Sequence, residues 1–476
     1  MRPRSLLAGC YTYATYLCVW TIKKFAVRYC GRVDTTGARE AQVHVPDGER
    51  QRPTERRWSR RRTGGQRRRS PFASVAPTAG LAGAYGIAVA VWVVAGDRLP
   101  GGRWLAVHLF TLGVLTNVVV AFSQHFGQTV TRAAAQRWAW QPVLLNAGVV
   151  LVLVGIPTRT PWSTGVGATI ATGVVLASYL RLWRMRRSAV GARFAWIARV
   201  YERAHGSFVH GAILGALLGV GLLNGSWYGA GRVAHLHVNV LGWAGLTLLA
   251  TLVFFGPTMV RTRIEDGADT RAAVALRRGA TALTVAVLLL LATGFGGPAG
   301  VTLRVAAAVA LGVYAWAVGA VCLPVLRAAR TAKPSAARPP LIALCAWFVV
   351  AAWVDVAVVG AGALRLLDAL GLAALVGVLG QAIATALTYI APALRGHTND
   401  ERGQLTKRMA PGATSRTIVY NAGTAAIVAA AAGGADLADT GARIAAAGWL
   451  LVIAVHVLQA AAALWPLGRG RAARPA

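Results

Sequence analysis

The sequence contains few acidic residues and few charged residues of any kind. Among its 476 residues, Asp and Glu number 16 against 50 Lys and Arg, and charged residues make up 14% of the chain. A soluble globular chain is about a quarter charged, so this composition argues against a conventional soluble domain. The hydrophobic share is 56%, and it is arranged in blocks of roughly 20 residues, the length that crosses a bilayer.

Motifs of soluble enzymes are missing from the sequence. It has no Walker phosphate loop, no G-x-S-x-G, no H-E-x-x-H and no glycine-rich dinucleotide fingerprint. Its few cysteines form neither a C-x-x-C pair nor a zinc-type spacing; they are Cys10, Cys18, Cys30, Cys322 and Cys345. We therefore expect no disulfide framework and no zinc framework.

The net charge of +34 would suggest nucleic-acid binding in a soluble protein. Here the basic residues flank the apolar blocks, and the cytoplasmic face of a membrane attracts Lys and Arg. No nucleic-acid-binding motif accompanies the charge. The expected partner is therefore the lipid bilayer, and nucleic acid is not expected.

The composition divides the chain into three parts. Residues 1–76 hold 17 of the 50 Lys and Arg, and we expect them to form a disordered basic tail, or to be upstream sequence included by a wrongly assigned start codon. Residues 77–467 are expected to form one transmembrane domain, and residues 468–476 a short basic tail.

The transmembrane domain is predicted to be an all-α, polytopic bundle of about twelve transmembrane helices. The connections after even-numbered segments carry 23 Lys and Arg, and those after odd-numbered segments carry 7. By the positive-inside rule this alternation places both the N- and C-termini in the cytoplasm, and we expect a prokaryotic cytoplasmic membrane. The predicted segments are 79–96, 103–125, 141–157, 163–181, 205–223, 234–257, 278–296, 301–323, 341–361, 369–391, 415–433 and 443–465.

Two segments carry histidines at the same predicted depth. His108 lies in the outer half of the second segment, and His235 and His237 lie at the outer end of the sixth. Titratable side chains are costly within a bilayer and usually mark a site there, and imidazole is a common ligand of haem iron and copper. We predict a metal or cofactor site formed by His108 with His235 or His237, supported by Asn239. The competing interpretation is that these side chains only hydrogen-bond across helices.

A second, weaker pair of histidines is predicted near the cytoplasmic side. His125 ends the second segment there, and His205 and His210 begin the fifth, so His125 and His210 form a second candidate metal pair. Asp355, in the outer part of the ninth segment, is expected either to pair with an outer-loop arginine such as Arg365 or to relay protons.

The span plan and two motifs resemble the haem-copper oxidase subunit I superfamily. The motifs are HLFTLGVLTNVVVAFSQHF at 108–126 and AHLHVNVLGWAGLT at 234–247, the latter followed by GPTMVRTR at 256–263. The closer resemblance is to divergent relatives: NnrS-type proteins, and the membrane portion joined to multicopper oxidase or copper nitrite reductase domains in actinobacteria. The resemblance implies an integral membrane haem- or copper-binding protein in electron transfer, metal handling or nitrogen-oxide metabolism, with a redox or multicopper protein as partner.

The sequence also departs from that superfamily. Oxidases of this kind have a histidine pair in the seventh segment and haem-ligating histidines in the tenth, and neither segment has one here. The full oxygen-reducing centre is therefore not expected, and we do not expect a complete oxidase. Two alternatives stay open: a twelve-span, proton-coupled secondary transporter, and a non-catalytic membrane scaffold for a copper enzyme. No repeat is evident between residues 79–257 and 278–465, as many transporters would show.

Overall fold

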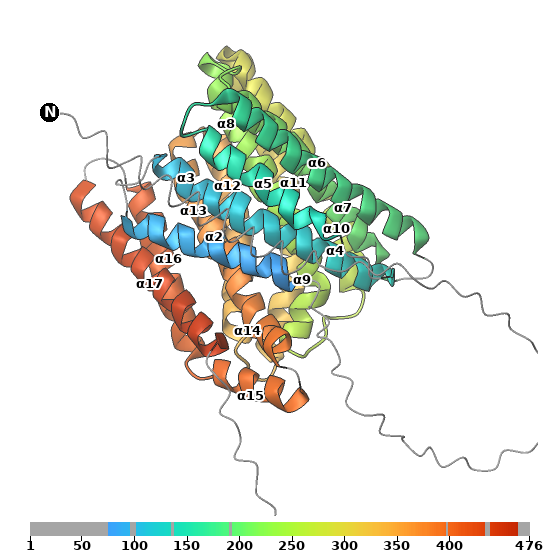
Figure 1. The fold of residues 1–476 in the computed structure, drawn as a ribbon. Coiled ribbons are helices and arrows are strands. Elements are labelled where there is room, and N and C mark those ends of the chain that lie inside the picture. Colours follow the sequence, from blue (N-terminus) through green and yellow to red (C-terminus); the bar gives the residue numbers. More distant parts are fainter. Residues whose placement is uncertain are drawn as a thin grey trace, which may run out of the picture. The chain divides into compact units, whose positions relative to one another are not determined.

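The computed structural model describes residues 75–95, 101–134, 138–189, 193–396, 398–433 and 438–464, and within these ranges all regular structure is helical (Figure 1). The basic tails predicted over residues 1–76 and 468–476 lie outside the described residues, except for residues 75 and 76. The chain divides into two units, Met1–Arg68 with Trp138–Val143, and Arg69–Arg137 with Leu144–Ala476. The second unit contains all the helices below except the first turn of α5.

The helices follow one another in three successive sets, and in each set the second membrane helix is interrupted. The first set contains α2 (Ala76–Ala95), α3 (Gly102–His108) continuing through η2 (Leu109–Leu115) into α4 (Thr116–Thr131), α5 (Trp140–Gly155) and α6 (Pro161–Ser188). The second contains α7 (Ala195–Gly219), α8 (Gly225–His237) continuing through η3 (Val238–Gly245) into α9 (Leu246–Met259), α10 (Ala268–Ala292) with η4 (Thr293–Phe295), and α11 (Gly297–Thr331). The third contains α12 (Arg338–Ala361), η5 (Leu364–Leu366), α13 (Leu367–Leu372) continuing through η6 (Ala373–Gly380) into α14 (Gln381–Arg395), α15 (Asn399–Met409), α16 (Ala413–Ala432) and α17 (Ala438–Leu464).

The all-helical membrane class is supported by helix length and composition. Within the described residues, nine helices are long and apolar enough to cross a membrane, so the chain has the features of a multi-pass membrane protein. All twelve predicted segments coincide with helices, but α5, α7 and α16 are not among the nine. Helix α5 has only 16 residues, about 24 Å against a hydrocarbon core of about 30 Å. The count of twelve and the location of the termini therefore stay predictions.

The interruption in each set is a π-helical segment. These segments, η2, η3 and η6, begin at Leu109, Val238 and Ala373, which are 129 and then 135 residues apart. π-helical turns are rare and are often found at functional sites. Their recurrence at the same place in each set indicates an internal threefold repeat, which a comparison of the two halves of the sequence cannot detect.

Aligned residues support this repeat. At an offset of 129 residues, the first and second sets share identical residues at these positions: Gly102 and Gly231, Arg103 and Arg232, His108 and His237, Gly113 and Gly242, Phe126 and Phe255, Gly127 and Gly256, Thr129 and Thr258, and Arg132 and Arg261. Arg132 and Arg261 even share a left-handed backbone, with φ of 56° and 55°. The third set keeps the glycine that is equivalent to Gly113 and Gly242, as Gly377.

Each π segment displaces backbone carbonyls from the regular hydrogen-bond ladder, and side chains satisfy them. Tyr314 Oη donates to Leu241 O at 2.9 Å, and Tyr420 Oη donates to Val376 O at 2.9 Å. Leu241 and Val376 are equivalent positions of the second and third sets. Because a buried carbonyl without a partner is costly, these tyrosines stabilise the π conformation.

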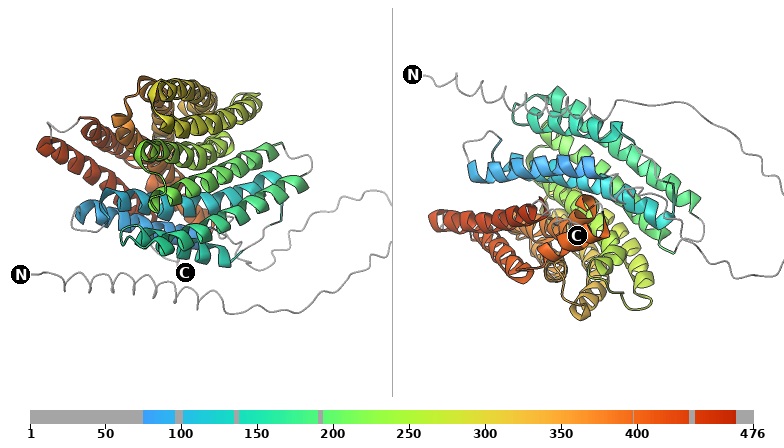
Figure 2. Two further views of the ribbon diagram at one scale, coloured as in Figure 1. Left: turned by 90° about the horizontal axis from the view of Figure 1, so that it is seen from above. Right: turned by 60° about the horizontal axis from the view of Figure 1, so that its bottom comes forward.

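Glycines in the π segments allow neighbouring helices to pack closely. A Cβ at Gly113, Gly242 or Gly377 would lie within 3 Å of a side chain from the first helix of the same set; these side chains are Tyr85, Ser207 and Trp347. The equivalent packing in all three sets identifies a shared tertiary design. The α16–α17 hairpin of the third set packs against α12, α13 and α14 at the edge of the bundle (Figure 2).

Candidate functional site

His108 is the last residue of α3, directly before the first π segment. Its Nδ1 donates to Trp104 O at 2.8 Å, and the Trp104 ring stacks on the imidazole with ring centroids 4.1 Å apart and an interplanar angle of 20°. A carbonyl oxygen can only accept a hydrogen bond, so the proton of the neutral ring lies on Nδ1. The Nε2 atom of His108 therefore carries a lone pair that can bind a metal ion.

His235 is also held through its Nδ1 atom by a backbone carbonyl, but this carbonyl belongs to a neighbouring helix. Its Nδ1 donates to Gly211 O of α7 at 2.9 Å, which again leaves the Nε2 lone pair as the ligand atom. Asn239 Nδ2 donates to His235 O at 2.8 Å. A Cβ at Gly211 would lie 2.3 Å from the Asn239 amide and a Cβ at Gly215 2.8 Å from the His235 ring, so these two glycines of α7 make room for both side chains.

The imidazoles of His108 and His235 lie close together in the bundle. Their ring centroids are 6.4 Å apart and their planes differ by 25°. Helices α3 and α8 belong to the second and sixth predicted segments, and the sequence had left open whether His235 or His237 faces His108. In the structure the neighbour of His108 is His235.

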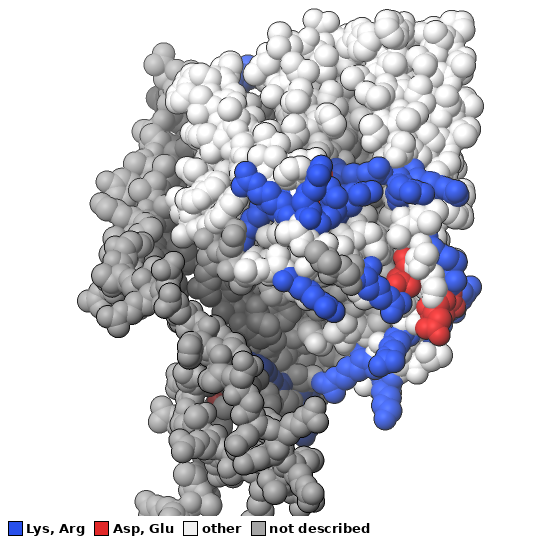
Figure 3. All heavy atoms as spheres, turned by 90° about the vertical axis from the view of Figure 1, so that its right-hand side faces the viewer, with Lys and Arg blue, Asp and Glu red and all other residues white. Residues whose placement is uncertain are grey.

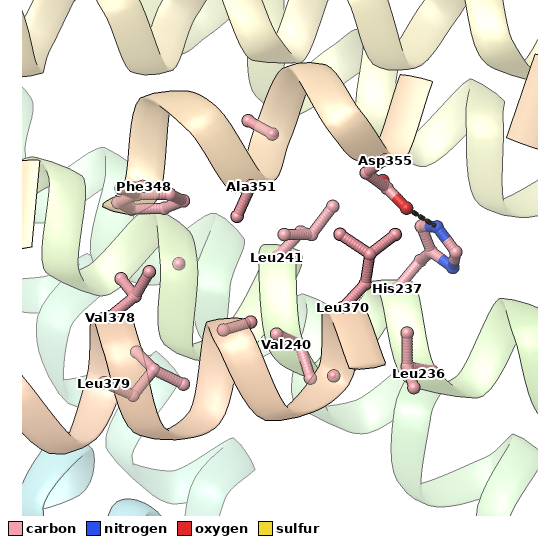
Figure 4. Close-up of a pocket in the computed structure, with 14 residues that line it drawn as sticks. Leu236, His237, Val240, Leu241, Phe348, Ala351, Asp355, Leu370, Val378 and Leu379 are labelled. Atoms are coloured by element: carbon pink, nitrogen blue, oxygen red, sulfur yellow. Dashed lines mark hydrogen bonds and ion pairs between the residues drawn. The ribbon is translucent and has the colours of Figure 1, made fainter. Parts of the chain in front are cut away.

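His237 faces another part of the bundle. It is fully buried, its Nδ1 donates to Val233 O at 2.8 Å, and its Nε2 lies 3.2 Å from Asp355 Oδ1 of α12 (Figure 4). Two residues apart on a helix, His235 and His237 point in nearly opposite directions. Asp355 thus pairs with His237, and not with an outer-loop arginine such as Arg365.

The His237–Asp355 pair lines a small cavity. The cavity has a volume of about 30 Å³, enough for about two water molecules. Apart from the pair its lining is apolar, and it includes Leu241, Phe348 and Leu370 (Figure 4). Because His237 Nδ1 already donates to a carbonyl, the contact between Nε2 and the carboxyl group requires one further proton, carried by either partner.

The second predicted pair, His125 and His210, is placed differently. His125 contacts the Phe126 ring, with centroids 5.4 Å apart, whereas the His210 side chain is exposed on α7. The buried histidine of this region is His205, which accepts a hydrogen bond at Nε2 from Ser178 Oγ at 3.0 Å. The sequence places His205 near His210 and indicates no role for it.

Hydrogen bonds link His205 to a buried arginine. Arg181 Nη1 donates to Gln124 Oε1 at 2.5 Å, and Gln124 Nε2 donates to Ser178 Oγ at 2.8 Å. The donors therefore point in one direction, from Arg181 through Gln124 and Ser178 to His205. This chain joins α4, α6 and α7, and we assign it a structural role.

An ion-pair cluster lies about one turn before His108 and His235 along their helices. Arg103 Nη2 lies 2.5 Å from Asp368 Oδ2, and Arg232 Nη2 lies 3.0 Å from Asp368 Oδ1. The two arginines are equivalent positions of the first and second sets, and Asp368 belongs to the third. The cluster ties the interrupted helices of all three sets together near their N-terminal ends.

The residues suited to a metal or cofactor are few. Within the part of the chain that the structure describes, no group of three or more His, Cys, Asp or Glu side chains is arranged to hold a metal ion. A closed tetrahedral site, which needs four such ligands, is therefore not formed by these residues. Two neighbouring imidazoles, His108 and His235, would be the residues to hold haem iron or copper, since imidazole is a ligand of both metals.

Comparisons with known proteins add no family assignment, because no protein-family model and no curated protein matches the chain.

Proposed function

We propose that this multi-pass membrane protein binds haem or copper between His108 and His235, and that it acts in electron transfer, metal handling or nitrogen-oxide metabolism. The observation that carries the proposal is the pairing of these two rings, from two separate helices, each with Nδ1 fixed on a backbone carbonyl. Fixing one imidazole nitrogen orients the other toward a metal, as in many metalloproteins.

The separation of the rings supports the proposal. The ring centroids of His108 and His235 lie 6.4 Å apart, so both imidazoles are close enough to serve as ligands of one bound group. Bound iron or copper would supply one-electron chemistry. The residues of the chain would hold and orient the group, with Trp104 stacked behind His108 and Asn239 beside His235.

The proposal covers a site and not an oxygen-reducing centre. The third set has Leu372 at the position equivalent to His108 and His237. From these residues we propose that the protein lies in the cytoplasmic membrane of a prokaryote. It would exchange electrons or metal with a redox or multicopper partner and would have no oxidase activity of its own.

An absorption spectrum and metal analysis test the proposal. The full chain, purified in mild detergent, is expected to show a Soret band or about one copper ion per chain, and His108→Ala and His235→Ala are each expected to lose it. His456→Ala is the matched control, because that half-buried histidine also donates from Nδ1 to a carbonyl of its own helix, Val452 O. Wild-type protein without haem or bound copper would refute the proposal.

A second candidate function is proton-coupled secondary transport, and one observation favours it. A carboxyl group at membrane depth, Asp355, shares a proton with His237 beside a cavity, and such groups often line proton pathways. The test is substrate uptake into proteoliposomes under an imposed pH gradient. Uptake that is abolished in Asp355→Asn, together with a wild-type protein that binds no metal, would favour the transporter over the metal protein.

A further inference from the structure

Three guanidinium groups gather where α7 and α10 lie side by side. Arg203 Nη1 donates to Arg277 O at 2.8 Å and to Thr281 Oγ1 at 3.3 Å, so its side chain lies across the gap between the two helices. Partial burial, and after it the positive charges of Arg199 and Arg277, lower the pKa of Arg203, and all three side chains are classed as exposed. Such a cluster of like charges is unfavourable unless a counter-ion binds to it.

Three carboxylates of this region pair with other arginines. Glu202 pairs with Arg186, Asp269 with Arg193, and Glu265 with Arg271. Among the residues that the structure describes, no carboxylate forms an ion pair with any member of the cluster. The described residues therefore leave Arg199, Arg203 and Arg277 without a carboxylate counter-ion.

Apolar side chains continue from the cluster along both helices. Ile213 of α7 is 52% exposed, and Val285 and Leu288 of α10 are 45% and 62% exposed. Ile213 lies ten residues beyond Arg203, which is about 15 Å along a helix. On the face of the molecule drawn in Figure 3, Lys and Arg form a band next to a broad, nearly uncharged area. A basic end followed by an apolar face matches a phospholipid, with its phosphate at one end and its acyl chains behind.

We propose that this α7–α10 surface binds the headgroup of an anionic phospholipid of the cytoplasmic leaflet. Arg199, Arg203 and Arg277 donate to the phosphate oxygens, and the acyl chains lie against Ile213 and Leu288. Arginine forms bidentate hydrogen bonds with phosphate, and basic pockets between transmembrane helices on the cytoplasmic side are known to bind anionic headgroups. With three positive charges, the site favours a lipid with two phosphates over one with a single phosphate.

Native mass spectrometry of the full chain in detergent, titrated with cardiolipin, phosphatidylglycerol or phosphatidylcholine, tests this proposal. The triple variant Arg199→Gln, Arg203→Gln, Arg277→Gln is expected to bind cardiolipin about tenfold more weakly than wild type, a loss of about 1.4 kcal/mol. The control variant Arg184→Gln, Arg187→Gln, Arg330→Gln removes the same charge from the same predicted membrane side and is expected to change binding by less than about twofold. Equal losses in both variants, or no loss in either, would overturn the proposal.

Two further measurements apply if the glutamine variant does not fold. The triple Arg→Lys variant keeps the charge, and we expect it to retain cardiolipin binding to within about threefold. In the wild-type protein, inorganic phosphate at the lipid's concentration is expected not to displace cardiolipin, because it lacks the acyl chains. Efficient displacement by phosphate, or equal binding of phosphatidylcholine, would show that the surface is not a lipid site.

Discussion

The second and third sets of helices both contain a π segment at the same place in their interrupted helix, but they carry different side chains there. In both, a π segment follows the first part of the interrupted helix, and a tyrosine hydroxyl satisfies the equivalent carbonyl, Leu241 O or Val376 O. The second set has His237 at the end of α8, where the third has Leu372 at the end of α13. The π segment therefore does not depend on the histidines.

The structure that supports the π segments is independent of the histidines. It consists of glycines, a tyrosine hydroxyl and displaced carbonyls. It recurs because the hydroxyl satisfies a carbonyl and the glycines leave room for neighbouring side chains. His108 and His237 occupy equivalent positions of the first two sets, but their neighbours differ. His108 lies next to His235, whereas His237 contacts Asp355. Equivalent positions thus support different chemistry.

The largest expected effect comes from giving the second set the side chain of the third. The substitution His237→Leu removes the partner of Asp355, which is buried in the bundle. We expect a loss of about 3–5 kcal/mol in stability, the usual cost of leaving one member of a buried pair without its partner. Thermal unfolding in detergent, followed by circular dichroism, measures the change.

The double variant His237→Leu, Asp355→Leu is the control, because it removes the polar group together with its partner. Replacing both members of a buried pair by apolar groups is often nearly neutral, so we expect the double variant to recover most of the lost stability. A double variant that is less stable than His237→Leu would contradict the pairing.

A smaller effect is expected from filling the space beside the displaced carbonyls. A Cβ at Gly245 would lie 2.6 Å from Tyr314 Oη, and a Cβ at Gly380 would lie 2.8 Å from Tyr420 Oη. Gly245→Ala and Gly380→Ala should each push the hydroxyl off its carbonyl and cost about 1–3 kcal/mol, because the carbonyl is left without a partner. The melting temperatures of the two variants should fall by similar amounts.

Gly312→Ala of α11 is the matched control, since nothing lies within 4 Å of a Cβ at Gly312. Alanine is favoured over glycine in a helix by about 0.5–1 kcal/mol, so this variant should be at least as stable as wild type. If Gly245→Ala were equally harmless, the hydrogen bond from Tyr314 would not stabilise the π segment.

The smallest effect is expected at the ion-pair cluster of Arg103, Arg232 and Asp368, which joins the three sets. Arg103 and Arg232 are 67% and 63% exposed, and exposed ion pairs contribute about 0–1 kcal/mol. Arg103→Gln and Arg232→Gln should each lower stability by less than about 1 kcal/mol, and by similar amounts, because the two residues are equivalent. A strong dependence on which arginine is replaced, measured by the same thermal unfolding, would contradict a symmetric cluster.

Much of the fold could be predicted from the sequence. Each of the twelve apolar segments coincides with a helix, because a long apolar block in a membrane must satisfy its backbone hydrogen bonds internally and a helix does so. Helix α15 was not predicted. It is short and polar, and its start is marked only by a capping box between Thr398 and Glu401.

The candidate site could be predicted only in part. The predicted depths of His108 and His235 assigned both residues to one candidate site. Depth, however, cannot tell which face of a helix a side chain occupies. The pairing of His237 with Asp355 joins residues 118 positions apart, and no local pattern marks such a contact. The repeat was also missed, although the spacing of Gly102-Arg103 and Gly231-Arg232 could have indicated that the first two sets are related.

The sequence by itself determined that the chain forms helices able to cross a membrane, since apolar content and spacing decide that locally. It also determined that histidines lie among those helices. Only the tertiary structure decided which imidazole meets which partner, and where the helices become π-helical. The reason is that these choices depend on the neighbours supplied by other helices: the carbonyl of Gly211 beside His235, the carboxyl group of Asp355 beside His237, and the tyrosine hydroxyls beside the displaced carbonyls.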